Sequence, residues 1–97
     1  MGEFDDIDVQ ELIEKTAKQR EENFQNIFTT VKEDIKVAAA QGLPFSKTMT
    51  SIFESALPDG YGNRIAKAWE GKGILEVNVT WNSHYERVTV FIRWAKN

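Results

Sequence analysis

The side chains that could do chemistry in this chain are few, and their spacing is poor for catalysis. The one histidine, His84, follows Ser83, and the 97 residues include no cysteine. A serine nucleophile needs an orienting carboxylate and an oxyanion hole as well as a histidine. A zinc site needs further histidine or cysteine ligands. The sequence therefore predicts no catalytic residue, no metal site and no cofactor site.

Neighbouring acidic residues and short glycine-containing stretches are the other candidates for chemistry. A catalytic carboxylate pair has to face one substrate, whereas adjacent residues on a helix diverge by about 100° around its axis. The stretches GYGN (60–63) and GKG (71–73) match neither a P-loop nor a dinucleotide-binding motif. We therefore expect a protein that is not an enzyme. The acidic pairs are Asp5-Asp6, Glu21-Glu22 and Glu33-Asp34.

The composition predicts one small soluble domain. The chain is 41% hydrophobic and 28% charged, with two prolines and six glycines, which argues against disorder. No apolar run approaches the roughly 20 residues that span a bilayer, and the acidic start does not resemble a secretion signal. We expect a single α+β domain over residues 1–97, located in the cytoplasm, with residues 1–7 as a candidate flexible acidic arm.

A long N-terminal helix is the strongest structural prediction. Asp8 can cap its start, and Gly42 followed by Pro44 ends it. A helix of roughly 32 residues is about 48 Å long, whereas a compact globule of this size is only about 32 Å across. The helix must therefore break near residues 18–23, protrude, or pack along a second copy of itself. Its apolar residues recur three and four apart, at Leu12, Ile13, Ala17, Phe24, Ile27, Phe28, Val31, Ile35, Ala38 and Ala39.

Two shorter helices are expected next in the chain. Ser46 can cap the first of them, whose apolar stripe runs from Met49 to Leu57. A turn at residues 57–60 ends it, and a third helix is expected over residues 63–70.

The C-terminal segment, residues 73–94, predicts an antiparallel β-hairpin because apolar and polar residues alternate in both halves. Pairing residues whose numbers sum to 167 sets Val79 opposite Val88, with an even-numbered loop at Ser83-His84 or at 82–85. A two-stranded hairpin alone is marginally stable in water. We therefore expect the amphipathic helices to cover its valine-rich face, and each strand to keep one open edge.

Protein binding is the function that we expect. Net charge is −3, and residues 1–14 contain six acids and no base. The chain is expected to be a small regulator or inhibitor of the kind found among phage accessory proteins, and to self-associate as a homo-dimer or other homo-oligomer. Its acidic helix face is a candidate mimic of nucleic-acid phosphates. The residues expected to bind the partner are Asp5, Asp6, Asp8, Glu11, Glu14, Tyr85 and Arg93.

A DNA-binding protein of the winged-helix type is the alternative. Helix, helix, short helix and hairpin follow one another in that order, so helix 63–70 would enter the major groove and the hairpin would contact the backbone. The negative net charge and the short recognition helix disfavour this interpretation. The residues expected to contact DNA are Asn63, Arg64, Lys67, Lys72 and Arg87.

Overall fold

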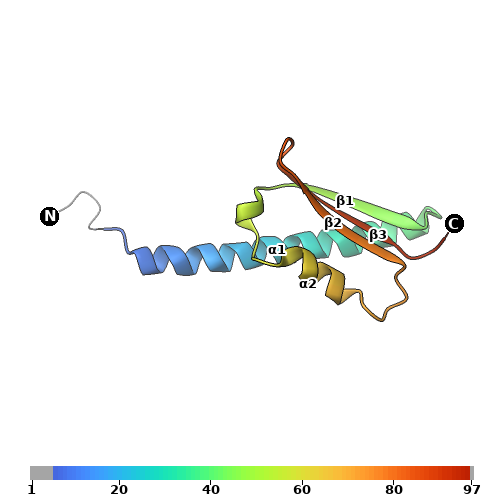
Figure 1. Ribbon diagram of the computed structural model, residues 1–97, viewed down its shortest axis with the longest axis horizontal. Helices are drawn as coiled ribbons and strands as arrows, with labels where there is room; N and C mark the ends of the chain where they lie inside the picture. Colours follow the sequence, from blue (N-terminus) through green and yellow to red (C-terminus); the bar gives the residue numbers. More distant parts are fainter. Residues whose placement is uncertain (1–5, 97) are drawn as a thin grey trace.

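One continuous helix, α1 (Val9–Ala40), runs along the longest dimension of the molecule (Figure 1). The computed structural model describes residues 6–96 of the chain. The Asp8 carboxylate accepts hydrogen bonds from the backbone N–H groups of Gln10 and Glu11, at 3.0 and 3.4 Å, and so caps the helix as predicted. The stop at Gly42 is also confirmed, with φ +82°. Of the three alternatives for this helix, a break near residues 18–23 is excluded, and the helix protrudes from the folded body.

The prediction of a second helix after Ser46 is wrong, because residues 45–51 form a strand, β1 (Phe45–Ser51). Its residues alternate between buried Ser46 and Thr48 and exposed Lys47 and Met49, which is the period of a strand. Ser46 is therefore a buried strand residue and not a helix cap. Only Glu54–Ala56 is helical, as one turn of 3-10 helix, η1.

The C-terminal hairpin is confirmed as β2 (Glu76–Asn82) and β3 (Arg87–Arg93), but its predicted register is wrong. Val79 lies opposite Val90 and not opposite Val88, so the numbers of facing residues sum to 169 rather than 167. A shift of two residues keeps the same side chains on each face, so the valine-rich face is preserved.

The hairpin loop explains this shift of register. It comprises the four residues 83–86, an even number as predicted, although at different positions. The side chain of Asn82 accepts hydrogen bonds from the backbone N–H groups of His84 and Tyr85 at 2.9 and 3.1 Å. Such side-chain bonds stabilise a turn that begins at asparagine.

The sheet has three antiparallel strands in the order β1-β3-β2. Because β1 pairs with β3, it occupies one of the two hairpin edges that we expected to be open. The third predicted helix is present as α2 (Tyr61–Ala68), so the protein has two α-helices among its described residues rather than the three expected.

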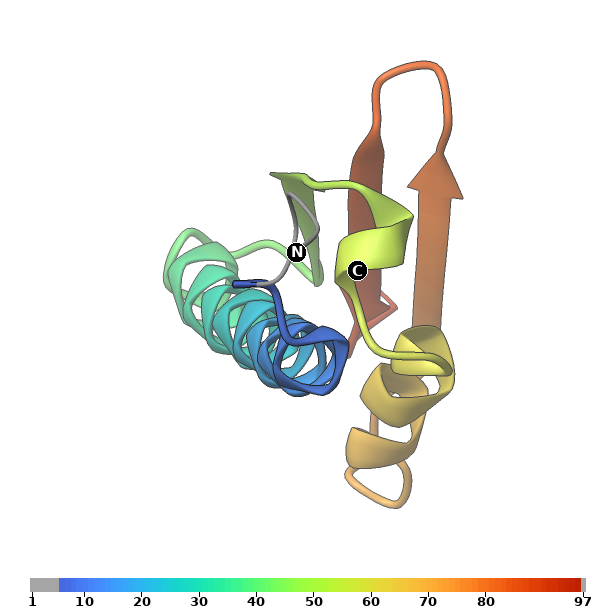
Figure 2. The same ribbon diagram turned by 90° about the vertical axis from the view of Figure 1, so that its left-hand side faces the viewer.

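The valine-rich face of the sheet is covered by the chain's own helices, as predicted. The two helices lie on the same side of the sheet, with α1 against β1 and α2 against β2 (Figure 2). The side chains between the layers form one α+β core. Its buried members are Phe24, Ile27, Val31, Leu57, Ile65, Val88, Val90 and Ile92.

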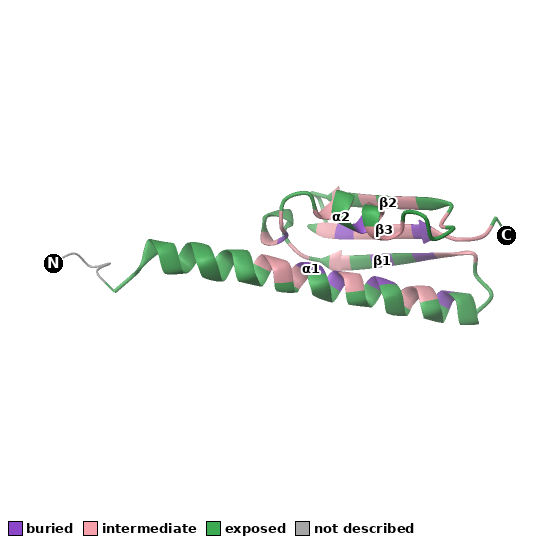
Figure 3. Cartoon of the chain, turned by 90° about the horizontal axis from the view of Figure 1, so that it is seen from below, coloured by how far each residue is buried: buried purple, intermediate pink, exposed green. Residues whose placement is uncertain are grey.

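The sheet covers only part of α1. Residues 9–19 are all exposed, whereas Phe24, Ile27, Val31 and Ala38 are buried (Figure 3). We call residues 9–20 the projecting segment and residues 24–38 the covered segment. The fold therefore presents three turns of helix beyond the end of the sheet.

Candidate functional site

The projecting segment carries an apolar stripe on the same side of α1 as the core-facing stripe, with Arg20 between the two. Val9 precedes Ile27 by eighteen residues, and Ile13 precedes Val31 by the same number, which is about five full turns of an α-helix. Each pair therefore shares one side of α1. Ile27 and Val31 are 4% and 0% exposed, but Val9 and Ile13 are 65% and 56% exposed. The same side of the helix is therefore buried by the sheet at Ile27 and Val31 and exposed to solvent at Val9 and Ile13.

Phe53 lies beside residues 16–20 of the projecting segment and adds an exposed apolar side chain there. Its side chain is 60% exposed. It lines a hollow together with Thr16, Gln19, Arg20 and Ala56, so this hollow is formed jointly by α1 and η1. It also lines a second hollow with Tyr85 in the hairpin loop. Phe53 therefore lies between residues 16–20 of α1 and the hairpin loop.

Hydrogen bonds from α1 and α2 hold η1, which directly follows Phe53 in the chain. The Arg20 Nε donates to the Ser55 carbonyl at 2.9 Å, and Asn23 Nδ2 donates to the Ala56 carbonyl at 2.9 Å. The Tyr61 hydroxyl donates to the Glu54 carboxylate at 2.7 Å, and burial raises the pKa of Tyr61 to about 12. These bonds anchor η1 from both sides.

The charges of this region separate along the helix. Residues 6–14, which we call the tip, contain four acids and no base, and residues 15–20, which we call the root, contain three bases and no acid. The Glu11 carboxylate pairs with the Lys15 ammonium at 3.0 Å, with both side chains more than half exposed. The tip acids are Asp6, Asp8, Glu11 and Glu14, and the root bases are Lys15, Lys18 and Arg20. The segment is therefore strongly polarised.

The residues predicted to bind a partner do not all meet on one surface. Asp6, Asp8, Glu11 and Glu14 are exposed on the tip, and Asp5 lies outside the described residues. Tyr85 is 60% exposed in the loop before β3. Arg93 ends β3 at the opposite end of the strand, over the stacked rings of Phe45 and Phe91 at 5.7 and 5.5 Å from their centroids. Tyr85 therefore adjoins the stripe, and Arg93 does not.

The residues predicted to contact DNA lie on two sides of the sheet. Asn63, Arg64 and Lys67 are on α2, which packs on the valine-rich face, whereas Arg87 alternates with the buried Val88 and belongs to the other face. The Arg87 guanidinium lies 5.0 Å from the centroid of the Tyr85 ring. These groups do not form one basic surface. Lys72 lies over the Trp69 ring, 5.9 Å from its centroid.

Arg64, the central residue of that alternative, is already engaged within the protein. Its guanidinium donates to both carboxylate oxygens of Glu21 at 2.7 and 2.9 Å, and it lies 4.0 Å from the centroid of the Phe24 ring. The hydrogen bonds from Arg64 hold the pKa of Glu21 at about 2, well below its usual value. A DNA phosphate would have to compete with this bidentate pair.

His84, Glu22 and Glu33 are exposed, whereas Glu21 and Asp34 are partly buried. His84 is exposed in the hairpin loop, with its ring edge against Tyr85 at a centroid distance of 4.7 Å. Glu21 faces Arg64 while Glu22 is exposed, and Asp34 accepts a hydrogen bond from the Thr48 hydroxyl at 2.7 Å. Among residues 6–96, no group of three or more acidic or histidine side chains is placed to hold a metal ion.

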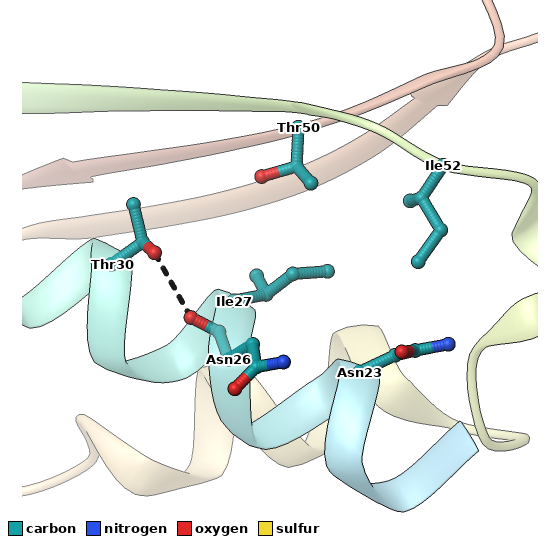
Figure 4. A pocket seen from close by; sticks show the side chains of 6 residues that line it. All are labelled: Asn23, Asn26, Ile27, Thr30, Thr50 and Ile52. Atoms are coloured by element: carbon teal, nitrogen blue, oxygen red, sulfur yellow. Dashed lines mark hydrogen bonds between the residues drawn. The ribbon is translucent and has the colours of Figure 1, made fainter. Parts of the chain in front are cut away.

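A further hollow lies between α1 and the end of β1, and its lining is not titratable (Figure 4). One of its hydroxyls, on Thr30, donates to the Asn26 carbonyl at 3.0 Å and is part of the helix surface. Amide, hydroxyl and aliphatic groups supply neither an acid nor a base at neutral pH. The lining residues are Asn23, Asn26, Ile27, Thr30, Thr50 and Ile52.

Comparison of the chain with protein-family models, with curated proteins and with solved structures finds no match. Within the described part of the chain, neither helix combines the length and the apolar character that crossing a membrane requires.

Sequence reasoning placed none of Val9, Leu12, Ile13 and Phe53 among the partner-binding residues, and it used Leu12 and Ile13 only as evidence for an amphipathic helix. Phe53 was assigned to the buried stripe of a helix that does not form. The signal that could have found Val9 is the length of α1, because a helix longer than the globule must leave some of its apolar stripe uncovered.

Proposed function

We propose that this chain is a non-enzymatic interaction domain that binds a protein partner through the apolar surface of the projecting segment. We call this the stripe surface, and it consists of Val9, Leu12, Ile13 and Phe53, with Tyr85 at its border. The observation that carries the proposal is the continuity of one helix face, which is buried beneath the sheet and then exposed for three further turns.

Burial of this surface against a partner would be favourable. A fully buried valine, leucine, isoleucine or phenylalanine side chain contributes about 1.5–3 kcal/mol relative to an exposed one. Leu12 and Ile13 are 51% and 56% exposed, so about half of that gain is still available to a partner. An apolar helix face of this kind docks against a groove or against another helix.

The acids of the tip have a supporting role in this proposal. They give the surface a charged border, which favours specificity and the rate of association more than affinity. Imitation of DNA phosphates has less support, because Lys15, Lys18 and Arg20 follow the acids within two turns of the helix. The role that we propose is that of a small regulator or inhibitor that acts by protein contact at this surface.

The test compares two glutamate substitutions on a tagged chain incubated with extract of the native host. Ile13→Glu places a charge in the stripe surface, and Leu75→Glu places one at another exposed leucine, which is 54% exposed next to the start of β2. We expect a stoichiometric protein, a second copy of the chain included, to be retained by the wild type and by Leu75→Glu and to be lost from Ile13→Glu. Retention of the same protein by Ile13→Glu would overturn the proposal.

Duplex DNA provides the second arm of this test. We expect negligible binding even at low salt, where contacts to phosphates are strongest. Tight, strongly salt-dependent binding that Arg64→Gln abolishes would favour the winged-helix alternative over the stripe surface.

A further inference from the structure

We infer that the occupant of the stripe surface is a second copy of this chain, with the two projecting segments paired side by side and antiparallel. This inference rests on the proposed function and names its partner. Three observations carry it: the spacing of the apolar positions, the separation of charge along the segment, and the hollow beside Phe53.

The apolar positions suit a symmetric contact centred at Ile13. Val9, Ile13 and Ala17 are four residues apart and form one ridge of the helix surface. In an antiparallel pair with its two-fold axis at Ile13, the Ile13 side chains face each other and each Val9 lies beside the Ala17 of the other copy. A two-fold interface uses the same patch on both copies, so the patch must be complementary to itself. The small Ala17 side chain leaves room for Val9.

The charges select the antiparallel orientation. The tip has a formal charge of −4 and the root a formal charge of +3. Antiparallel pairing sets each tip beside the root of the other copy, whereas parallel pairing sets tip beside tip and root beside root. Packed helix axes are about 8–10 Å apart, which is close to the Debye length at physiological salt, so these charges interact. Opposite charges attract in the first arrangement and like charges repel in the second.

The hollow beside Phe53 is placed to receive the tip of the other copy. With the axis at Ile13, α1 of one copy begins at Val9, level with Ala17 of the other copy and two residues short of Gln19, which lines that hollow together with Phe53. Ile7 and Phe53 are both exposed in the single chain. The sheet and α2 lie toward the other end of α1, so antiparallel pairing keeps the two folded bodies apart (Figure 1).

The first experiment measures the molar mass of the purified full-length chain by size-exclusion chromatography with light scattering. We expect two chains per particle, with dissociation on dilution from near-millimolar to low micromolar concentration. Ile13→Glu should raise the dissociation constant by about a hundredfold or more, because it removes two buried isoleucines and sets two like charges at the axis. Leu75→Glu should leave the dissociation constant unchanged. A wild-type chain that remains single at near-millimolar concentration overturns the inference.

The second experiment determines the orientation by disulfide formation, which is clean because the chain has no cysteine of its own. Val9→Cys and Ala17→Cys are made as separate variants, mixed in equal amounts, reduced and then oxidised. Antiparallel pairing brings position 9 beside position 17, so we expect mixed disulfides between the two variants. Disulfides that join Val9→Cys to itself would mean parallel pairing and overturn the inference. Ile13→Cys, which lies on the axis, is the positive control for proximity.

These outcomes separate the inference from the proposed function. A chain that is single when pure, but captures a different protein through an Ile13-dependent contact, overturns the second copy as occupant and leaves the stripe surface as a protein-binding site. A dimer that Ile13→Glu does not weaken overturns the inference, because its contact lies elsewhere. A single chain with no Ile13-dependent partner overturns both.

Discussion

The projecting and covered segments of α1 have nearly the same sequence pattern and different surroundings. Ile13 and Val31 occupy the same side of the helix, yet Ile13 is 56% exposed and Val31 is fully buried. The comparison shows that the periodicity of the sequence identifies the apolar face of a helix. The length of the sheet then determines how much of that face the chain itself buries. In our proposal, a partner buries the part of the apolar face that the sheet does not contact.

The two segments are also stabilised by different forces. Tertiary packing against the sheet holds the covered segment, which is how most protein helices are stabilised. Local interactions support the projecting segment, including the Asp8 cap, the Glu11–Lys15 ion pair and the hydrogen bond from Gln19 to Asn23 at 2.9 Å. Side-chain pairs of this kind contribute only about 0.2–0.5 kcal/mol each, and an N-cap contributes about 1 kcal/mol. The projecting segment should therefore open far more readily than the covered one.

The largest expected difference comes from truncating one isoleucine in each segment. Ile27→Ala should reduce the free energy of unfolding by about 2–5 kcal/mol, because it leaves a cavity in the core. Ile13→Ala should change it by less than about 0.5 kcal/mol in dilute protein, where its side chain is in water. Urea denaturation of both variants at low micromolar concentration measures the two effects.

This pair of variants is matched in residue type, helix and helix face. Comparable losses of stability from both would contradict the division of α1 into a covered and a projecting segment. Repeating the Ile13→Ala measurement at high protein concentration adds a test of pairing, because a dimer interface makes stability depend on concentration.

Elements with long periodic patterns could be predicted from the sequence, and β1 could not. The bounds of α1 follow from Asp8, Gly42 and an unbroken pattern between them. The stretch from Phe45 to Leu57 is short and fits two periods at once, since serine and threonine alternate at one spacing while larger apolar residues recur at another. Residues 45–51 form a strand because they pair with the open edge of β3, and that edge exists only in the folded protein.

The candidate site was predictable only in outline. The acids of the tip are visible in the sequence as a run without a base. Phe53 and Tyr85 adjoin the stripe because η1 and the hairpin loop reach the same end of the sheet, and this depends on the β1–β3 pairing. The hairpin register depended on the side chain of Asn82, a local contact that alternation alone does not specify.

A smaller effect is expected from removing the helix cap, and it should be confined to one segment. Asp8→Ala leaves two backbone N–H groups without their acceptor and should destabilise the end of the helix by about 1 kcal/mol. Hydrogen exchange followed by mass spectrometry should show faster exchange in residues 9–20 and unchanged exchange in residues 24–38. Equal acceleration in both ranges would mean that α1 opens as one unit and would remove the distinction between its segments.

The smallest effect concerns the ion pair at the boundary between the two segments, and it should appear only in acid. The folded-state pKa of Glu21 is about 2 and its ordinary value is 4.5, so the pair with Arg64 stabilises the fold fully above pH 4.5. That contribution should be lost as the pH falls from 4.5 to 2, because Glu21 then binds a proton more readily in the unfolded chain.

Arg64→Gln should return the Glu21 pKa toward 4.5, as followed by carboxyl NMR titration, and should flatten this part of the profile of stability against pH. The two side chains are 41% and 47% exposed, so water and salt screen the pair, and the change in urea midpoint should be smaller than that of Ile27→Ala. A Glu21 pKa near 4.5 in the wild type would show that Arg64 is free, and would restore it as a phosphate-binding residue on α2.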